Sequence, residues 1–206
     1  MKTISKALVL TAHPDDLELS CGGTVSKIVS QGGVVDNLIL FPYQDHKKYL
    51  PETSKILGFK PIFFDANIVI AQRGRTYERP KLDNKLIEKI EKQLNINDYD
   101  LLITHWKEDW HQDHRICHEV GNTLRRKQPL EVWYMNAFPY CQKYTSFEAN
   151  IFSDISEHYK SKRKAIETYK NVNPRWADDI ESMSRFRGSF INKQHAEVFK
   201  ADTILF

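Results

Sequence analysis

Two short clusters of histidine and carboxylate side chains could form a chemical site in this sequence, and each follows an apolar run. The first cluster is His13-Pro14-Asp15-Asp16, directly after Ala7–Thr11. The second is His105-Trp106-Lys107-Glu108-Asp109-Trp110-His111-Gln112-Asp113-His114-Arg115, about ninety residues downstream of the first and directly after the apolar run Leu101–Thr104. Imidazoles and carboxylates are zinc ligands, and they also act as general acids and bases. The clusters therefore indicate a zinc-dependent hydrolytic site.

The first cluster combines a strand end with a helix start. Pro14 disfavours the helical region for the residue before it, so His13 is expected at the end of an extended strand. Proline and carboxylates suit the first turn of a helix, which predicts a helix beginning near Asp15 and Asp16. Neighbouring residues on a turn point in different directions, so one carboxylate can bind a metal while the other faces the reacting water. A simple helix cap would explain only one of the two.

The second cluster has helical spacing. His111 and His114 are three residues apart, which places both rings on one side of a helix. Asp113 is suited to hold one ring by a hydrogen bond. His13, Asp16 and His114 would give one zinc ion per chain three protein ligands and an open position, as in catalytic zinc sites. Iron(II) or cobalt could occupy the same donor set.

The elements that would position these clusters alternate between strand and helix. Such alternation is typical of a single α/β domain with a parallel, Rossmann-like sheet and right-handed crossovers. In the common strand order 3-2-1-4-5, the first and fourth strands are neighbours, and their carboxyl ends flank the position where such folds bind ligands. Strands are predicted at 7–11, 34–41, 61–64, 101–104 and 130–134, and helices at 24–31, 53–57, 82–94 and 114–126.

The C-terminal quarter departs from this alternation. Two helices are predicted, over 157–169 and 175–186, followed by a final strand over 198–206. We expect this quarter to pack on the core and to border the site, so that residues 1–206 form one domain. The basic run Lys162-Arg163-Lys164 is expected to be a solvated face, and the pair Gly22-Gly23 a tight helix entry.

Composition narrows the class of protein. A chain of 206 residues with 41% hydrophobic and 28% charged residues can form one globular domain. The net charge of +3 is too small to indicate a nucleic-acid partner. No apolar run reaches the roughly 18 residues that a membrane span needs. The three cysteines lack zinc-finger spacing and are odd in number, which favours a reducing compartment, the cytoplasm.

The segments AHPDDLE and HQDHR, in this order, resemble the LmbE/PIG-L family of zinc-dependent de-N-acetylases. Near the C-terminus, Phe186-Arg187-Gly188 and His195-Ala196-Glu197-Val198-Phe199 are similar to a family end motif, in which tyrosine commonly stands at the position of His195. The resemblance implies a Rossmann-like α/β fold. It also implies removal of acetyl groups from N-acetylated sugars or related small conjugates.

The same resemblance implies a role for each matching residue. His13, Asp16 and His114 are implied as the zinc ligands, and Asp15 as the general base. His111 is implied to polarise the carbonyl or to protonate the leaving amine. Asp113 would orient His111, and a nearby carboxylate is expected to favour its protonated form.

Several features have more than one interpretation. Glu18 is the next candidate for the base, and His105 could line the site or be structural. Trp110 is a candidate for a sugar-contacting surface. Arg73 and Arg75 are candidates for a substrate-binding arginine.

Two other functions also fit the motifs. The chain could be an amidase acting on another sugar-conjugate amide, because the chemistry would be the same. It could also be a zinc-containing glycan-binding protein without turnover, although an intact Asp15 and His111 argue against that. The oligomeric state stays open.

Overall fold

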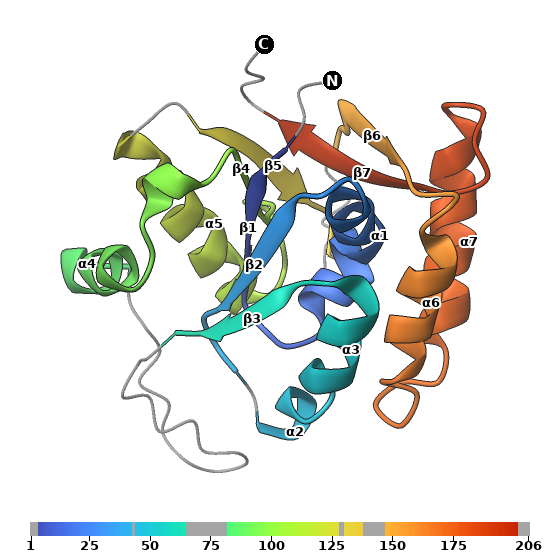
Figure 1. The fold of residues 1–206 in the computed structure, drawn as a ribbon, viewed down its shortest axis with the longest axis horizontal. Helices are drawn as coiled ribbons and strands as arrows, with labels where there is room; N and C mark the ends of the chain where they lie inside the picture. The colour runs from blue at the N-terminus through green and yellow to red at the C-terminus, as the bar shows by residue number, and fades with distance from the viewer. Residues whose placement is uncertain (1–3, 43, 65–81, 128–129, 138–146, 202–206) are drawn as a thin grey trace.

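A seven-stranded, mostly parallel sheet forms the centre of the described chain, with strand order β3-β2-β1-β4-β5-β7-β6 (Figure 1). The computed structural model describes residues 4–42, 44–64, 82–127, 130–137 and 147–201. Strands β1 to β5 run parallel, β7 is antiparallel to β5, and β6 is antiparallel to β7. The strands are β1 Lys6–Thr11, β2 Val34–Ile39, β3 Lys60–Phe63, β4 Leu101–His105, β5 Glu131–Met135, β6 Ile151–Asp154 and β7 Ala196–Ala201.

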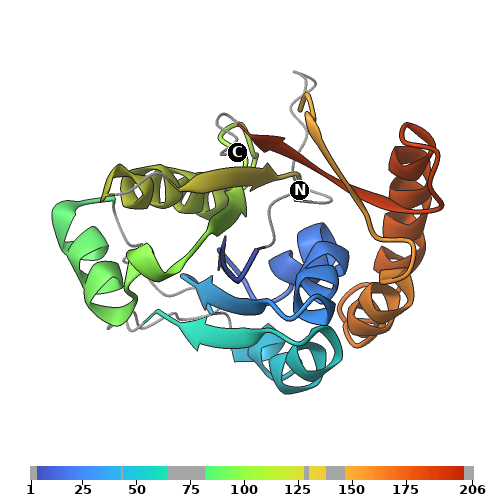
Figure 2. The same ribbon diagram turned by 45° about the horizontal axis from the view of Figure 1, so that its top comes forward.

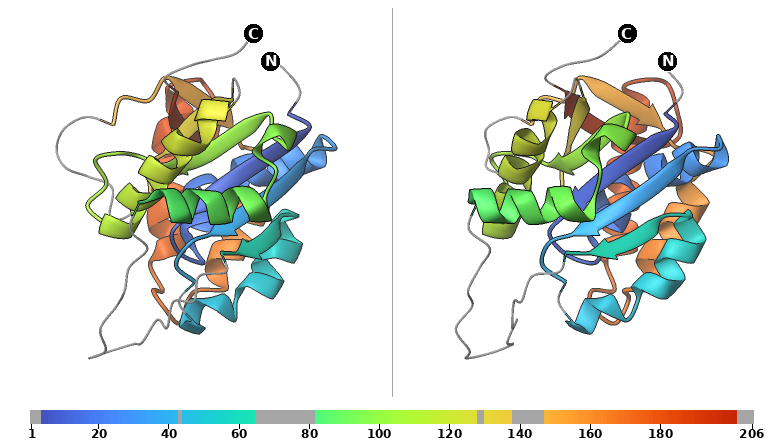
Figure 3. Two further views of the ribbon diagram at one scale, coloured as in Figure 1. Left: turned by 90° about the vertical axis from the view of Figure 1, so that its left-hand side faces the viewer. Right: turned by 60° about the vertical axis from the view of Figure 1, so that its left-hand side comes forward.

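Helices cover both faces of the sheet. The alternation of side chains along β1 sends Leu8 and Leu10 into one apolar cluster and Ala7 and Val9 into another. The first cluster includes residues of α4 and α5, which lie in front of the strands in Figure 3. The second includes residues of α1, α3 and α6. The helices are α1 Asp16–Ser30, α2 Gln44–Lys47, α3 Leu50–Leu57, α4 Asn84–Gln93, α5 Gln112–Leu124, α6 Tyr159–Glu167 and α7 Trp176–Ser189.

The structure confirms the predicted α/β class and the order 3-2-1-4-5 of the five parallel strands. It adds the antiparallel pair β6 and β7, which extends the sheet beyond β5 and lies beside α6 and α7 (Figure 2). The four-residue β6 and the short helix α2 were not predicted. The final strand begins at Ala196 rather than at 198, and residues 202–206 of the predicted strand lie outside the described residues. None of the described helices is long and apolar enough to cross a membrane.

The two consecutive glycines lie in the interior of α1, so the prediction of a tight helix entry is wrong. A Cβ atom on Gly23 would lie 2.7 Å from Cδ1 of Ile155, the residue that follows β6. Glycine at this position therefore allows the segment after β6 to approach the helix closely.

Lys162 is buried, which contradicts its prediction as part of a solvated basic face. Its Nζ lies 2.6 Å from Oε1 of Glu197 and donates to the backbone oxygen of Leu19 at 2.9 Å. Glu197 also accepts hydrogen bonds from the backbone amides of Gly23 and Thr24, at 2.8 and 2.7 Å. This buried ion pair ties α6 and β7 to α1, the helix that begins at the first site cluster.

Replacing Lys162 with methionine is expected to lower the free energy of unfolding by about 3 kcal/mol. Breaking a buried ion pair by removing one partner costs roughly 3–5 kcal/mol. The lower end of that range applies here because two backbone amides still donate to Glu197. Urea denaturation measures the change, with Lys164→Met as the matched control because Lys164 is exposed on the same helix. Equal stability of the two variants would show that the ion pair of Lys162 and Glu197 makes no net contribution to the free energy of unfolding.

Candidate metal centre and catalytic groups

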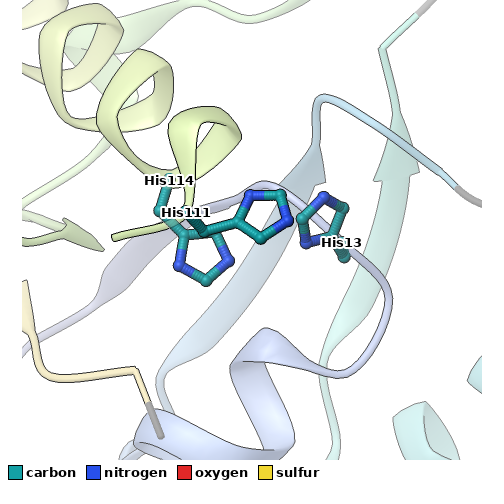
Figure 4. Close-up of side chains that lie close together, drawn as sticks. All are labelled: His13, His111 and His114. Atoms are coloured by element: carbon teal, nitrogen blue, oxygen red, sulfur yellow. The ribbon is translucent and has the colours of Figure 1, made fainter. Parts of the chain in front are cut away.

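The two sequence clusters meet where β1 and β4 end. These strands are parallel neighbours in the sheet, so their carboxyl ends lie at the same edge. His13 lies between β1 and α1, whereas His111 and His114 come from the start of α5 (Figure 4). The ring centroid of His13 is 4.7 Å from that of His111 and 5.4 Å from that of His114. The fold therefore assembles the three imidazoles that the sequence separates.

Asp16 lies between several of these rings. Its Oδ1 is 3.3 Å from Nε2 of His114, and its Oδ2 is 3.7 Å from Nδ1 of His13 and 3.2 Å from Nε2 of His105. The backbone amide of His13 donates to Oδ2 at 2.7 Å. Burial raises the pKa of Asp16, but His114 and His105 outweigh burial and hold the pKa well below its usual range. Asp16 is therefore ionised, as a metal ligand must be.

Among the described residues, two overlapping groups have ligand atoms close enough to hold one metal ion. Within each group the atoms lie within 4.8 Å of one another. The groups are His13, His111 and His114, and Asp16, His105 and His114. His114 belongs to both, and the predicted trio of His13, Asp16 and His114 takes members from each. A set of two imidazoles and one carboxylate fits zinc chemically.

Asp109, which sequence reasoning missed, fixes the orientation of His114. Its Oδ2 lies 2.8 Å from Nδ1 of His114, so Nε2 of that ring faces Asp16. Burial disfavours the charged ring, but Asp16 and Asp109 outweigh it and raise the pKa of His114 to about 10. The backbone amide of His111 donates to Oδ1 of the same aspartate at 2.8 Å. The only sequence signal for Asp109 was its position within the second cluster, where no role was assigned to it.

Replacing Asp109 with alanine is expected to weaken zinc affinity by roughly 10- to 100-fold, the usual effect of removing a carboxylate that holds a ligating histidine. Competition with a chromophoric chelator measures the affinity. Glu108→Ala is the control because it removes the same charge from the adjacent position. Equal affinities for the two variants would mean that Asp109 does not orient His114.

The surroundings of His111 contradict the expectation that its ring is protonated and stabilised by Asp113. Nδ1 of His111 accepts a hydrogen bond from the backbone amide of Asp113 at 3.2 Å, which assigns the proton of the neutral ring to Nε2. Burial, followed by the neighbouring His13 and His114, lowers the pKa of His111 to about 4. The carboxylate of Asp113 is closer to Nε2 of His13, at 3.1 Å, than to Nδ1 of His111, at 3.9 Å. His111 is therefore a neutral donor through Nε2–H.

Asp15 lies at the start of α1 and contacts a histidine that the sequence did not single out. Its Oδ2 is 2.9 Å from Nδ1 of His46, on α2. Burial is the main reason that the pKa of Asp15 is raised. Glu18, the alternative base, is fully buried, accepts from the hydroxyl of Tyr169 at 3.2 Å, and has a pKa raised by burial to about 7.

The other candidate residues differ in burial, and two of them lie outside the described residues. His105 is buried, and its ring stacks on His114 with centroids 3.9 Å apart, so it lines the candidate metal centre. Trp110 is 56% exposed, which leaves it available for a ligand. Arg73 and Arg75 lie outside the described residues.

The fold and site together define an α/β protein with a histidine and carboxylate centre at the carboxyl edge of its parallel strands. No protein-family model matches the chain, and no curated protein matches it. Solved structures do match over nearly the whole chain. A conserved protein of Thermus thermophilus is 21% identical, with 97% of this chain and 96% of that chain covered and a TM-score of 0.75.

Two further matching structures have stated activities. The 4-carboxy-2-hydroxymuconate hydratase of Pseudomonas putida is 15% identical, with 98% of each chain covered and a TM-score of 0.80. The N,N'-diacetylchitobiose deacetylase of Pyrococcus horikoshii is 18% identical, with 96% of this chain and 84% of that chain covered and a TM-score of 0.71. The chain therefore has the fold of known deacetylases, which confirms the predicted resemblance at the level of the fold.

Proposed function

We propose that this chain is a metal-dependent hydrolase that removes the acetyl group from an N-acetylated sugar or sugar conjugate. The observation that carries the proposal is the arrangement around Asp16: a compact histidine and carboxylate donor set with two catalytic candidates, Asp15 and His111, beside it. The matching deacetylase structures support the assignment through their fold.

We assign His13, Asp16 and His114 as the metal ligands, with zinc as the metal. Zinc at such a site supplies a Lewis acid for the carbonyl oxygen and the reacting water. Asp16 is ionised, and Nδ1 of His114 is hydrogen-bonded to the carboxylate of Asp109. These two properties fit the residues to a divalent cation, because the carboxylate is already ionised and the ring of His114 is already oriented. His114, whose pKa is raised to about 10, would release its extra proton when the cation binds.

The residues beside the ligands supply the proton transfers. Asp15 accepts a proton as water attacks the acetamide carbonyl, so that a carbon–oxygen bond forms. Nε2–H of His111 donates to the carbonyl oxygen as negative charge develops on it. The carbon–nitrogen bond then breaks, and the proton held by Asp15 passes to the leaving amine. Water and the amide are thereby converted to acetate and a free amino sugar.

Burial suits Asp15 for this role. A general base is most effective when its pKa lies near the working pH. The buried position of Asp15 moves its pKa in that direction from the ordinary value for an aspartate. Asp113 is assigned a positioning role through His13 as well as His111, on the basis of its distances to the two rings.

A screen for acetate release tests the proposal. Purified protein is incubated with N-acetylglucosamine, N,N'-diacetylchitobiose and UDP-N-acetylglucosamine, with added zinc or with a chelator. Zinc-dependent acetate release from at least one of them is the expected result.

The cytoplasm stays the proposed location, in keeping with free, buried Cys21 and Cys117.

The same screen separates the competing functions. Amine release without acetate from a panel of other acylated amino sugars would indicate the amidase alternative. The structural match to a hydratase makes water addition to a carbon–carbon double bond the second candidate, which loss of absorbance of 4-carboxy-2-hydroxymuconate would reveal. Sugar binding by calorimetry with no product would indicate a glycan-binding protein.

A further inference from the structure

His46 belongs to an element that has no part in the donor set, yet its side chain reaches the catalytic group Asp15. Helix α2, Gln44–Lys47, lies between β2 and α3. From there, Nδ1 of His46 comes within 2.9 Å of Oδ2 of Asp15. The two side chains are 26% and 10% exposed, so the contact is largely shielded from water. In this structure Nδ1 and Oδ2 lie at hydrogen-bond distance, although their alignment departs from that of an ideal hydrogen bond.

The ring of His46 also contacts an aromatic side chain. It packs edge-on against Tyr169, with centroids 6.1 Å apart, and Tyr49 packs on the same tyrosine at 4.9 Å. The hydroxyl of Tyr169 donates to Oε1 of Glu18, in the first turn of α1. Tyr169 is therefore anchored to the helix that begins at the metal centre. This support limits the positions that the His46 ring can take.

Charge complements this geometry. The contact with Asp15 is the main reason that the pKa of His46 is raised, and burial opposes the increase only in part. An imidazole can donate from Nδ1 to a carboxylate while Nε2 remains exposed to its other neighbours. A carboxylate held in this way has one oxygen engaged and the other available for proton transfer.

We propose that His46 is a positioning residue that fixes the carboxylate of Asp15 by donating from Nδ1 to Oδ2. The proposal rests on the function proposed above, because it assigns Asp15 as the base. It adds a residue from α2 to a site otherwise built from the segments after β1 and β4. It also accounts for the partial burial of an imidazole on a short helix that contributes no proposed metal ligand.

Three variants of His46 test this geometry. Asparagine places an amide N–H close to the position of Nδ1, whereas glutamine places its amide near that of Nε2. We expect His46→Ala and His46→Gln to lower kcat by roughly 10- to 100-fold, the effect of losing a hydrogen bond to a charged group. His46→Asn should retain most of kcat. KM and metal content should stay close to those of the wild type, because no ligand is changed.

A measurement without substrate separates this proposal from the proposed function. The ring nitrogens of His46 are observed by 15N NMR in metal-free protein at neutral pH. In the wild type, Nδ1 should carry a proton, and in Asp15→Asn the signal should move toward the neutral form protonated at Nε2. This result would support the contact even if the chain released no acetate.

Two outcomes would overturn the proposal. One is an unchanged NMR signal of His46 in Asp15→Asn, which would show that the two side chains do not interact. The other is an equal effect on kcat of the asparagine and glutamine variants, whether both retain activity or both lose it. In that case donation from the Nδ1 position has no specific role. Failure of the acetate screen with a normal NMR result would overturn only the proposed function.

Discussion

Replacing Asp15 with asparagine is expected to lower kcat by roughly two to four powers of ten while the chain keeps its metal. That is the usual contribution of a general base. The amide has nearly the shape of the carboxylate, so the start of α1 should be undisturbed, but it cannot accept a proton from water. Asp15 is not among the proposed ligands, although the adjacent Asp16 is. Single-turnover rates and metal analysis of the same preparation measure both effects.

Glu18→Gln is the matched control for this prediction. Glu18 lies on the same turn of α1, is fully buried and has a raised pKa, so it is the competing candidate for the base. Its carboxylate is held by Tyr169, however, which points to a structural role. A nearly normal rate in Asp15→Asn together with an inactive Glu18→Gln would transfer the role of base to Glu18.

The parallel core of the fold could be predicted because its signals are local. Apolar runs such as Ala7–Thr11 and Leu101–Thr104 are buried on both faces, and strands of this kind contain little but apolar residues. The C-terminal additions gave no such signal. β6 is only four residues long, Ile151–Asp154, and its pairing with β7 is a long-range interaction that no periodicity reveals.

The burial of Lys162 also depends on a long-range interaction that the local sequence does not reveal. In the sequence it stands in a run of three basic residues, which normally face water. In the structure its partner is Glu197, thirty-five positions away along the chain, and the pair reaches the middle of α1. A charge becomes suited to the interior only when such a partner is supplied by the fold, so composition alone predicts the wrong environment.

Some residues of the candidate site could be predicted from the sequence, and others could not. His13, Asp15, Asp16, His111, Asp113 and His114 could be selected from the sequence because each cluster is contiguous and follows an apolar run. Asp109 and His46 could not, since their importance depends on what they touch: Nδ1 of His114 in one case and Oδ2 of Asp15 in the other. The electrostatic state of His111 also required the structure, because burial and two neighbouring imidazoles outweigh Asp113.

Replacing His114 with alanine is expected to weaken metal binding by more than the roughly 10- to 100-fold expected for a residue that only orients a ligand. His114 belongs to both groups of close ligand atoms, so its loss should be damaging whichever group binds the metal. Zinc content after dialysis against a zinc buffer measures the effect. A full equivalent of zinc in His114→Ala would show that the metal centre has been placed incorrectly.

Three further variants determine which donor set is correct, because each possible set makes a different prediction. If His13, Asp16 and His114 hold the metal, His13→Ala should lose it, whereas His105→Gln and His111→Gln should retain it. If Asp16, His105 and His114 hold it instead, His105→Gln should lose metal and His13→Ala should keep it. Loss of metal in His111→Gln would favour the set of His13, His111 and His114. In that case His111 could not serve as the donor to the carbonyl oxygen. The metal content of these variants therefore tests the ligand assignment and the role of His111 in one experiment.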